Sequence, residues 1–194
     1  MAKTASTGFD FRKSLYGLAH PSQNVFILAN STTVKIGDAV RLNTAGYLVR
    51  AAAGEPVLGV LRGIEDKNQM NVFSPRASGI TGATLTPDDQ IATSSTNQSD
   101  TTRQLRGRVI LDPAGVCLFF NVADAALAQT NLGQMFDATN GNQINVASAS
   151  DSNGQWQLIQ LDPDGDGDTT KGLFRLTECQ LAVGIDQGTA KITA

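Results

Sequence analysis

The sequence is poor in the residues on which most enzyme and metal sites depend. Its 194 residues include one histidine, two cysteines and one tryptophan, and aromatic residues make up only 6%. His20, the single histidine, has no activated serine or cysteine in its neighbourhood, so a histidine-assisted nucleophile is not expected. HExxH, CxxC and phosphate-binding glycine patterns are also missing. We therefore predict a protein that is not an enzyme and that carries no cofactor.

Basic clusters and long apolar runs are missing as well. The formal net charge is -3, and the lysines and arginines form no cluster, so nucleic acid is not an expected partner. No apolar run approaches the ~18 residues that a membrane-spanning helix needs, and the N-terminus has no signal-peptide pattern. These absences predict a soluble protein that is not exported and does not bind membranes.

The two cysteines are the third scarce group. Cys117 and Cys179 each lie among apolar neighbours, a setting in which a buried free thiol is favoured over a disulfide. This pattern indicates a reducing compartment.

Turn-forming residues and short apolar runs are what the sequence has in plenty. Nineteen glycines accompany many Thr, Asn, Gln and Ala residues, a composition typical of short strands joined by turns. The stretch 34–63 alternates as strand, turn, strand, turn, strand, and the apolar run 25–29 predicts a central strand. The predicted fold is mainly β, an antiparallel β-barrel or sandwich of short strands with an extended N-terminal arm and little helix.

Composition along the chain suggests three parts. They are an N-terminal arm at 1–24, a β-barrel-like core domain at 25–120 with a long loop at 77–102, and a second β subdomain at 121–194 packed on the first. Within them, 104–111 and 116–120 are predicted to form a hairpin. The stretch 133–141 matches 37–46 in turn spacing but not in identity, so the sequence gives little support for an internal duplication.

The first 24 residues carry isolated apolar anchors in a polar, slightly basic background. Such a segment has too little apolar surface to fold by itself. Two alternatives stay open: an arm that orders against a neighbouring subunit or partner, or a strand or short helix packed on its own domain. The residues expected to bind the partner are Phe9, Phe11, Arg12, Leu15 and Tyr16.

Arg106 and Arg108 are expected to share one face of a strand. Such a pair could clamp a carboxylate of a partner, or it could simply protect a solvent-facing edge strand. Other charged pairs, at 65–66 and 88–89, are interpreted as solvated loop charges.

An acidic stretch at 162–168 resembles the front half of a calcium-binding EF-hand loop. Its carboxylates are Asp162, Asp164, Asp166 and Asp168. The twelfth position is Leu173, where a bidentate glutamate is required, and the flanks are predicted strands instead of helices. A solvated acidic hairpin loop is therefore favoured, with a calcium site of another type as the alternative.

Several turn and strand positions resemble the head decoration, or cement, proteins of tailed bacteriophages. These positions are Gly37, Asp38, Val40, Gly46, Gly59 and Val60, followed by the glycine and strand pattern at 133–138. The resemblance implies a structural virion protein that binds the outer capsid surface and joins neighbouring subunits of the major capsid protein. It also implies assembly in the host cytoplasm and a homotrimer, with a dimer as the alternative.

A second function stays open at this point. A carbohydrate- or host-surface-binding β-domain would use Trp156 or Tyr47 as a platform on which a sugar ring stacks, and the acidic loop could hold Ca²⁺.

Overall fold

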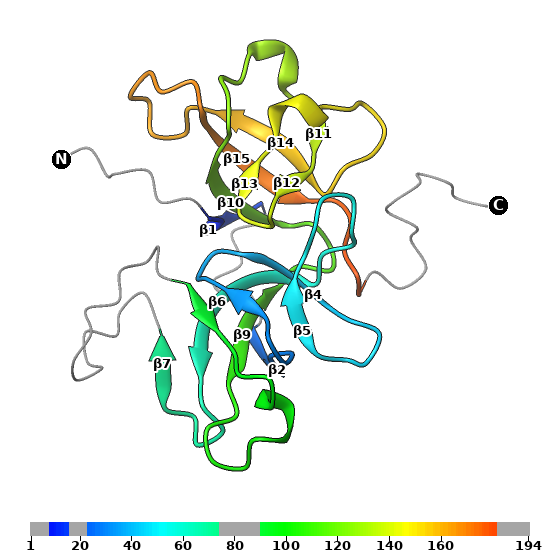
Figure 1. Cartoon of the computed structure of the whole chain (residues 1–194). Coiled ribbons are helices and arrows are strands. Elements are labelled where there is room, and N and C mark those ends of the chain that lie inside the picture. Colours follow the sequence, from blue (N-terminus) through cyan, green and yellow to red (C-terminus); the bar gives the residue numbers. More distant parts are fainter. Residues whose placement is uncertain (1–7, 16–22, 74–89, 182–194) are drawn as a thin grey trace.

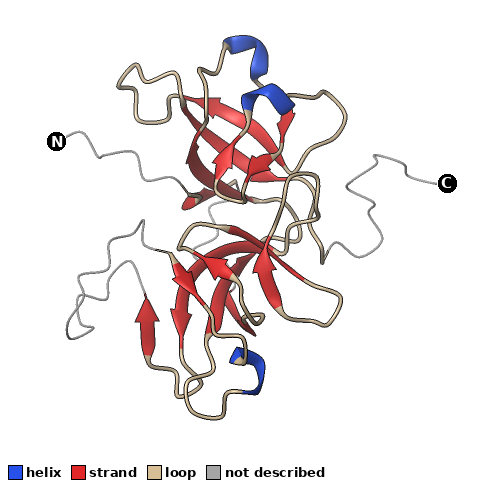
Figure 2. Ribbon diagram, in the orientation of Figure 1, coloured by secondary structure: helices blue, strands red, loops and turns tan. Residues whose placement is uncertain are grey.

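The computed structural model describes residues 8–15, 23–73 and 90–181. The chain is mainly β, and all strand pairs within its sheets are antiparallel. Helix in the described part is limited to three short 3-10 turns, η1 (Asn97–Ser99), η2 (Gln129–Asn131) and η3 (Val146–Ser148) (Figure 2). No sheet closes into a barrel within these ranges. The predicted mainly β class is confirmed, in its sandwich-like form.

Two larger sheets lie one above the other in Figure 1. The first sheet has the order β2 (Gln23–Ile27), β9 (Arg106–Leu111), β6 (Gly59–Glu65), β4 (Ala39–Leu42) and β5 (Leu48–Arg50), with β7 (Asn71–Phe73) also on β6. The second sheet has the order β1 (Asp10–Ser14), β10 (Cys117–Val122), β15 (Lys171–Leu176), β14 (Trp156–Leu161) and β11 (Met135–Phe136). Two small ladders pair β3 (Thr33–Val34) with β8 (Ile91–Ala92) and β12 (Ala138–Thr139) with β13 (Gln143–Ile144).

A single apolar core joins the two sheets. It contains Val60 and Ile110 from the first sheet and Phe119, Trp156 and Phe174 from the second. A further cluster lies within the first sheet, and its members include leucines of β5 and β6. Because burial of this shared apolar surface is the main favourable term in folding, we expect the sheets to unfold together.

The two sheets repeat one strand order. In the first sheet, the strands taken along the chain are β2, β4, β5, β6 and β9, and their spatial order is first, fifth, fourth, second, third. In the second sheet, β10, β15, β14 and β11 follow the same order. Here β13 takes the third place, since it pairs with β12, the continuation of β11. The topology therefore indicates an internal duplication of one five-stranded unit.

Backbone hydrogen bonds support the duplication residue by residue. The Gly37 N–H donates to the Leu61 carbonyl at 2.8 Å, and the Gly133 N–H donates to the Leu158 carbonyl at 2.9 Å. Both glycines have positive φ, 91° and 85°, a conformation that glycine adopts without the strain imposed by a side chain. Each glycine lies two residues before the second strand of its unit, so the turn spacing seen in the sequence reflects equivalent structure.

Isolated bridges repeat in the same way. Leu28 forms a parallel bridge with Leu48 in the first unit, and Ala123 forms one with Ile144 in the second. The residue after each bridge donates its N–H back to the same strand, Ala29 to Leu48 and the residue after Ala123 to Ile144, both at 2.9 Å. Matching contacts outside the regular ladders are not required by strand order alone, so they strengthen the case for duplication.

Gly107 and Gly172 occupy equivalent places in the two units, so the same prediction applies to both. A Cβ added at Gly107 would lie 2.5 Å from Cδ2 of Leu48 and 2.7 Å from Cδ1 of Leu61. One added at Gly172 would lie 2.7 Å from Cε2 of Phe174 and 2.8 Å from Cδ1 of Leu158. We expect Gly107→Ala and Gly172→Ala each to lower the free energy of unfolding by about 1 to 3 kcal/mol through overpacking. Chemical denaturation measures this cost.

The control for the glycine prediction shortens both facing leucines. Gly107→Ala combined with Leu48→Val and Leu61→Val should cost less than the sum of the separate changes, because valine has no Cδ atoms to clash. Additive costs, or an alanine at Gly107 that is harmless, would contradict the packing described here.

The structure corrects the predicted hairpin at 104–120. β9 pairs with β2 and β6 of the first sheet, whereas β10 pairs with β1 and β15 of the second. The turn itself forms, since the Asp112 carboxylate accepts the N–H groups of Val116 and Cys117, both at 2.9 Å, and Gly115 has φ of 61°. A local turn of this kind redirects the chain, and the long-range partners decide which sheet each strand enters.

Strand positions in the first sheet also differ from prediction. The stretch 34–63 does contain strands and turns in the predicted order, but β4 lies between β5 and β6. The run 25–29 overlaps β2, which is an edge strand and not a central one. Its Val25 is 45% exposed, so the continuous apolar run does not report burial on both faces.

Three further predictions concern Glu65, the loop 77–102 and the boundaries between the three parts of the chain. Glu65, interpreted as a solvated charge, lies in β6 and is buried. The predicted loop 77–102 contains β8 and η1 in its described part, and its residues 77–89 lie outside the described ranges. β1 and β10 both belong to the second sheet, so sheet membership does not follow the predicted part boundaries at 24 and 120.

Candidate functional site

Two of the predicted partner-binding residues of the N-terminal segment, Phe9 and Phe11, pack within their own chain. Phe9 is 2% exposed, and its ring stacks on Trp156 with a centroid distance of 3.8 Å. Phe11 packs edge-on against Phe119 at 6.1 Å. Burial of these rings requires β1 to stay docked on β10, so the structure shows the second alternative for residues 8–15: a strand on its own domain.

Charged residues of β1 tie it to both sheets. The Arg12 guanidinium lies 4.6 Å from the centroid of the Phe120 ring, a cation–π distance. Asp10 forms an ion pair with Arg62 of β6 at 3.1 Å. Leu15 is 43% exposed, and Tyr16 and His20 lie outside the described residues. Of the predicted binding residues described here, Leu15 is therefore the one whose apolar side chain faces solvent.

Arg106 and Arg108 do share a strand face, next to the edge strand β2. The register pairs Ile27 with Arg106 and Val25 with Arg108. Nε of Arg108 lies 2.5 Å from the carboxylate of Glu65. Nε and Nη2 of Arg106 donate to the side-chain carbonyl of Gln104 at 3.2 and 3.1 Å. Since Arg108 already holds a buried carboxylate, the pair cannot act as a two-armed clamp without giving up that contact.

The acidic loop 162–168 is closed by internal hydrogen bonds. The Asp162 carboxylate accepts the N–H groups of Asp166 and Gly167 at 3.1 and 2.8 Å. The Asp166 carboxylate pairs with the Lys171 ammonium, and this contact lowers the pKa of Asp166. Asp168 accepts from the N–H and hydroxyl of Thr170, which lower its pKa.

These contacts bear on the calcium alternative. Asp162, Asp166 and Asp168 already accept hydrogen bonds from donors in residues 166–171, and Asp164 is exposed. Across the described residues, no three histidine, cysteine, aspartate or glutamate side chains are grouped to hold a metal ion. The predicted hairpin itself is confirmed, because β14 and β15 pair on either side of the loop.

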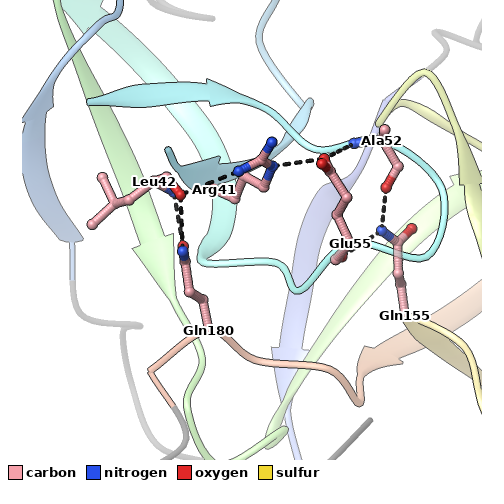
Figure 3. A network of polar contacts seen from close by, with 6 residues as sticks. All are labelled: Arg41, Leu42, Ala52, Glu55, Gln155 and Gln180. Carbon is pink, nitrogen blue, oxygen red and sulfur yellow. Dashed lines mark hydrogen bonds and ion pairs between the residues drawn. The ribbon is translucent and has the colours of Figure 1, made fainter. Parts of the chain in front are cut away.

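A network of polar contacts joins the two sheets (Figure 3). The Glu55 carboxylate accepts from Nε of Arg41 at 2.6 Å and from the Ala52 N–H at 2.8 Å. Burial acts to raise the pKa of Glu55, but these two donors outweigh it and lower the pKa. The fully buried Gln155 donates to the carbonyls of Ala52 and Glu55 at 2.6 and 2.7 Å. The 52–55 corner of the first unit is thereby attached to the second.

A second attachment lies beside it. The Gln180 side chain accepts from the Leu42 N–H at 2.8 Å and donates to the Leu42 carbonyl at 2.9 Å. The Val57 N–H donates to the carbonyl of Glu178, and the Gln180 N–H donates to that of Val57, both at 2.8 Å. With the shared core, these contacts hold the units in one fixed arrangement. Sequence reasoning missed this joint, because its glutamines are single polar residues with no spacing pattern.

The cysteines and Trp156 contribute to the core. Cys117 and Cys179 are both buried and neither forms a disulfide, as predicted. Burial, together with the nearby Asp112 carboxylate, raises the pKa of the Cys117 thiol to about 12, so this thiol stays protonated and poorly nucleophilic at neutral pH. Trp156 is fully buried and cannot offer its ring to a sugar. Tyr47 is half-buried.

Comparisons with known proteins leave the chain without an assigned family. Models of protein families, curated proteins and solved structures were compared, and none matches this chain. Within the described ranges, no helix has the length and apolar character required to cross a membrane.

Proposed function

We propose that this chain is a structural virion protein that binds the outer surface of a phage capsid and cements neighbouring subunits of the major capsid protein. The observation that carries the proposal is the internal duplication with its fixed joint. Two units of the same topology, held in one arrangement, place two surfaces at a constant separation. A lattice of identical capsid subunits offers matching sites at a constant separation, so one chain could contact two neighbours at once.

Each unit needs to bind its capsid site only modestly, because the two contacts act together. When one unit is bound, the second meets its site at a high effective concentration, and avidity exceeds the affinity of either unit. A rigid joint helps, because no conformational freedom between the units is lost on binding. Residence on the virion surface, assembly in the host cytoplasm and self-association as a trimer or dimer are parts of the same proposal.

Co-sedimentation with capsid shells tests the function directly. Shells of the phage that encodes this chain, prepared without it, should bind it to a saturating ratio, and the temperature at which they break open should rise. The matched control is a shell preparation already carrying the protein, which should take up little more. No binding at about 100 μM protein, which corresponds to an interaction weaker than about -5.5 kcal/mol, would refute the proposal.

A further inference from the structure

The duplication makes it possible to compare the outer edges of two equivalent strands. β10 is the first strand of the second unit, and its outer edge is covered by β1 from Asp10 to Ser14. β2 is the first strand of the first unit. Among the described residues, β2 pairs only with β9, so its outer edge carries no strand. One edge is therefore completed within the chain, and no strand of the described ranges covers its equivalent.

Val25 occupies the place that Phe120 occupies in the other unit. Each of the two residues pairs with the position that follows the equivalent glycine, Val25 with Arg108 and Phe120 with Leu173. Phe120 is covered and only 9% exposed, whereas Val25 is 45% exposed. An apolar side chain at the centre of an open edge strand is a feature that proteins usually protect.

The β2 strand itself lacks the charged residues and prolines that commonly protect an edge strand from pairing. Its sequence, Gln-Asn-Val-Phe-Ile, contains no charged residue and no proline. The β1 strand, in contrast, carries Asp10, Arg12 and Lys13. The closest cation to Val25 along the register is Arg108, which is paired with Glu65. Nothing in the charge distribution of β2 therefore opposes the approach of another neutral strand.

We propose that the β2 edge is the self-association surface of this protein and pairs antiparallel with β2 of a second copy across a two-fold axis. The occupant is a second copy because the strand is complementary to itself. Pairing centred on Val25 places it opposite Val25 of the other copy and Gln23 opposite Ile27, with no like charges facing. The two β9 strands that carry Arg108 lie about 14 Å apart, three strand spacings, and each Arg108 keeps its own carboxylate.

This surface selects the dimer over the trimer that the resemblance implies, since a symmetric strand pair closes after two copies. The inference does not depend on capsid binding, because it concerns the isolated protein. A five-residue strand pair is a small contact, so the dimer is weak in free solution. On a shell, neighbouring copies would be held close together, and the same contact would form at high effective concentration.

Analytical ultracentrifugation of the full chain tests the proposal, at about 5 to 500 μM so that a weak dimer becomes populated. The wild type should shift from monomer to dimer over this range. Val25→Lys and Val25→Glu should each weaken association at least tenfold, because each places two like charges in contact. Val25→Thr, a neutral β-branched control, should associate within about threefold of the wild type.

Mixing the two charged variants tests the register. In an equimolar mixture, Val25→Lys and Val25→Glu chains should form a heterodimer at least as tightly as the wild type associates, since opposite charges then face each other. A wild type that stays monomeric throughout, or a mixture that does not associate, overturns the proposal. So does a binding partner that occupies β2 while the protein alone stays monomeric. Shell binding is measured separately, so its failure is distinguishable from failure of the dimer.

Discussion

Replacing Phe9 with alanine is expected to lower the free energy of unfolding by about 3 to 5 kcal/mol, the usual cost of removing a buried phenylalanine ring. Phe9 is 2% exposed and stacks on Trp156, so the substitution leaves a cavity against the largest side chain of the core. The Phe9 N–H also donates to the Gly37 carbonyl at 2.8 Å, which ties β1 to the first unit. Denaturant unfolding followed by tryptophan fluorescence measures the effect.

Leu15→Ala is the matched control for the Phe9 prediction. Leu15 follows β1, is apolar and is 43% exposed, so its loss should cost less than about 1 kcal/mol. The cost of Phe9→Ala should not change with protein concentration, because the ring packs in its own chain. Equal effects of the two variants, or a cost that appears only as dissociation of an oligomer, would return the N-terminal segment to its other alternative, an arm on a neighbouring subunit.

Stability is also expected to depend on the ionisation of Asp38. This residue is fully buried, and burial raises its pKa from 3.8 to about 6, although the Arg50 guanidinium and the Lys35 N–H act to lower it. Both donors reach the same oxygen, Oδ2, at 2.8 Å. The other oxygen, Oδ1, is buried with no hydrogen-bond partner among the described residues. One ion pair therefore does not compensate for the loss of hydration at both oxygens.

The direction of the pH effect follows from the raised pKa. The folded chain keeps the Asp38 proton up to about pH 6, whereas the unfolded chain loses it near pH 3.8. The stabilising contribution of the neutral acid is thus fully present below pH 3.8 and is lost as the pH rises through about 6. Relative to Asp38→Asn, which cannot ionise, the wild type should lose about 2 kcal/mol between pH 4 and pH 7.

Asp100 provides a contrast of opposite sign. Its carboxylate accepts the N–H groups of Arg103 and Thr102, and these bonds lower its pKa. The contribution of Asp100 is present above its unfolded pKa and is lost as the pH falls, so Asp100→Asn should matter least in acid. Urea unfolding at several pH values measures both variants. If the wild type instead gained stability over Asp38→Asn between pH 4 and pH 7, the ion pair with Arg50 would outweigh burial.

Part of the duplication could be recognised in the sequence, because it depends on local turn geometry. Gly37 and Gly133 are spaced alike relative to their turns, and both adopt positive φ, so the turn spacing was a true signal. Few of the side chains around them are identical, because many residues can fill equivalent core positions as long as volume and polarity suit. The repeated hydrogen bonds run through backbone groups, which every residue carries, and so leave no mark on residue identity.

In the N-terminal segment, too, the sequence indicated the anchor residues and the tertiary structure showed their partners. Phe9 and Phe11 could be recognised as anchors, because aromatic residues in a polar segment need a partner surface. That surface proved to be Trp156 and Phe119, which follow more than 100 residues later along the chain. No local pattern encodes such a distant contact. The predicted site residues Arg106 and Arg108 likewise shared a face as expected, but Glu65 at the facing strand could be located only in three dimensions.

The sequence by itself determined the mainly β class, the places of the turns, the two buried cysteines without a disulfide and the acidic hairpin loop. Each of these depends on neighbours close in the chain: alternation along a strand, glycine at positive φ, or a carboxylate accepting nearby N–H groups. Tertiary structure alone decided the sheet to which each strand belongs, the joint at Glu55 and Gln155, and the open edge of β2. These features are set by long-range pairing and shared burial, whose free energy belongs to the assembled sheets and not to any one segment.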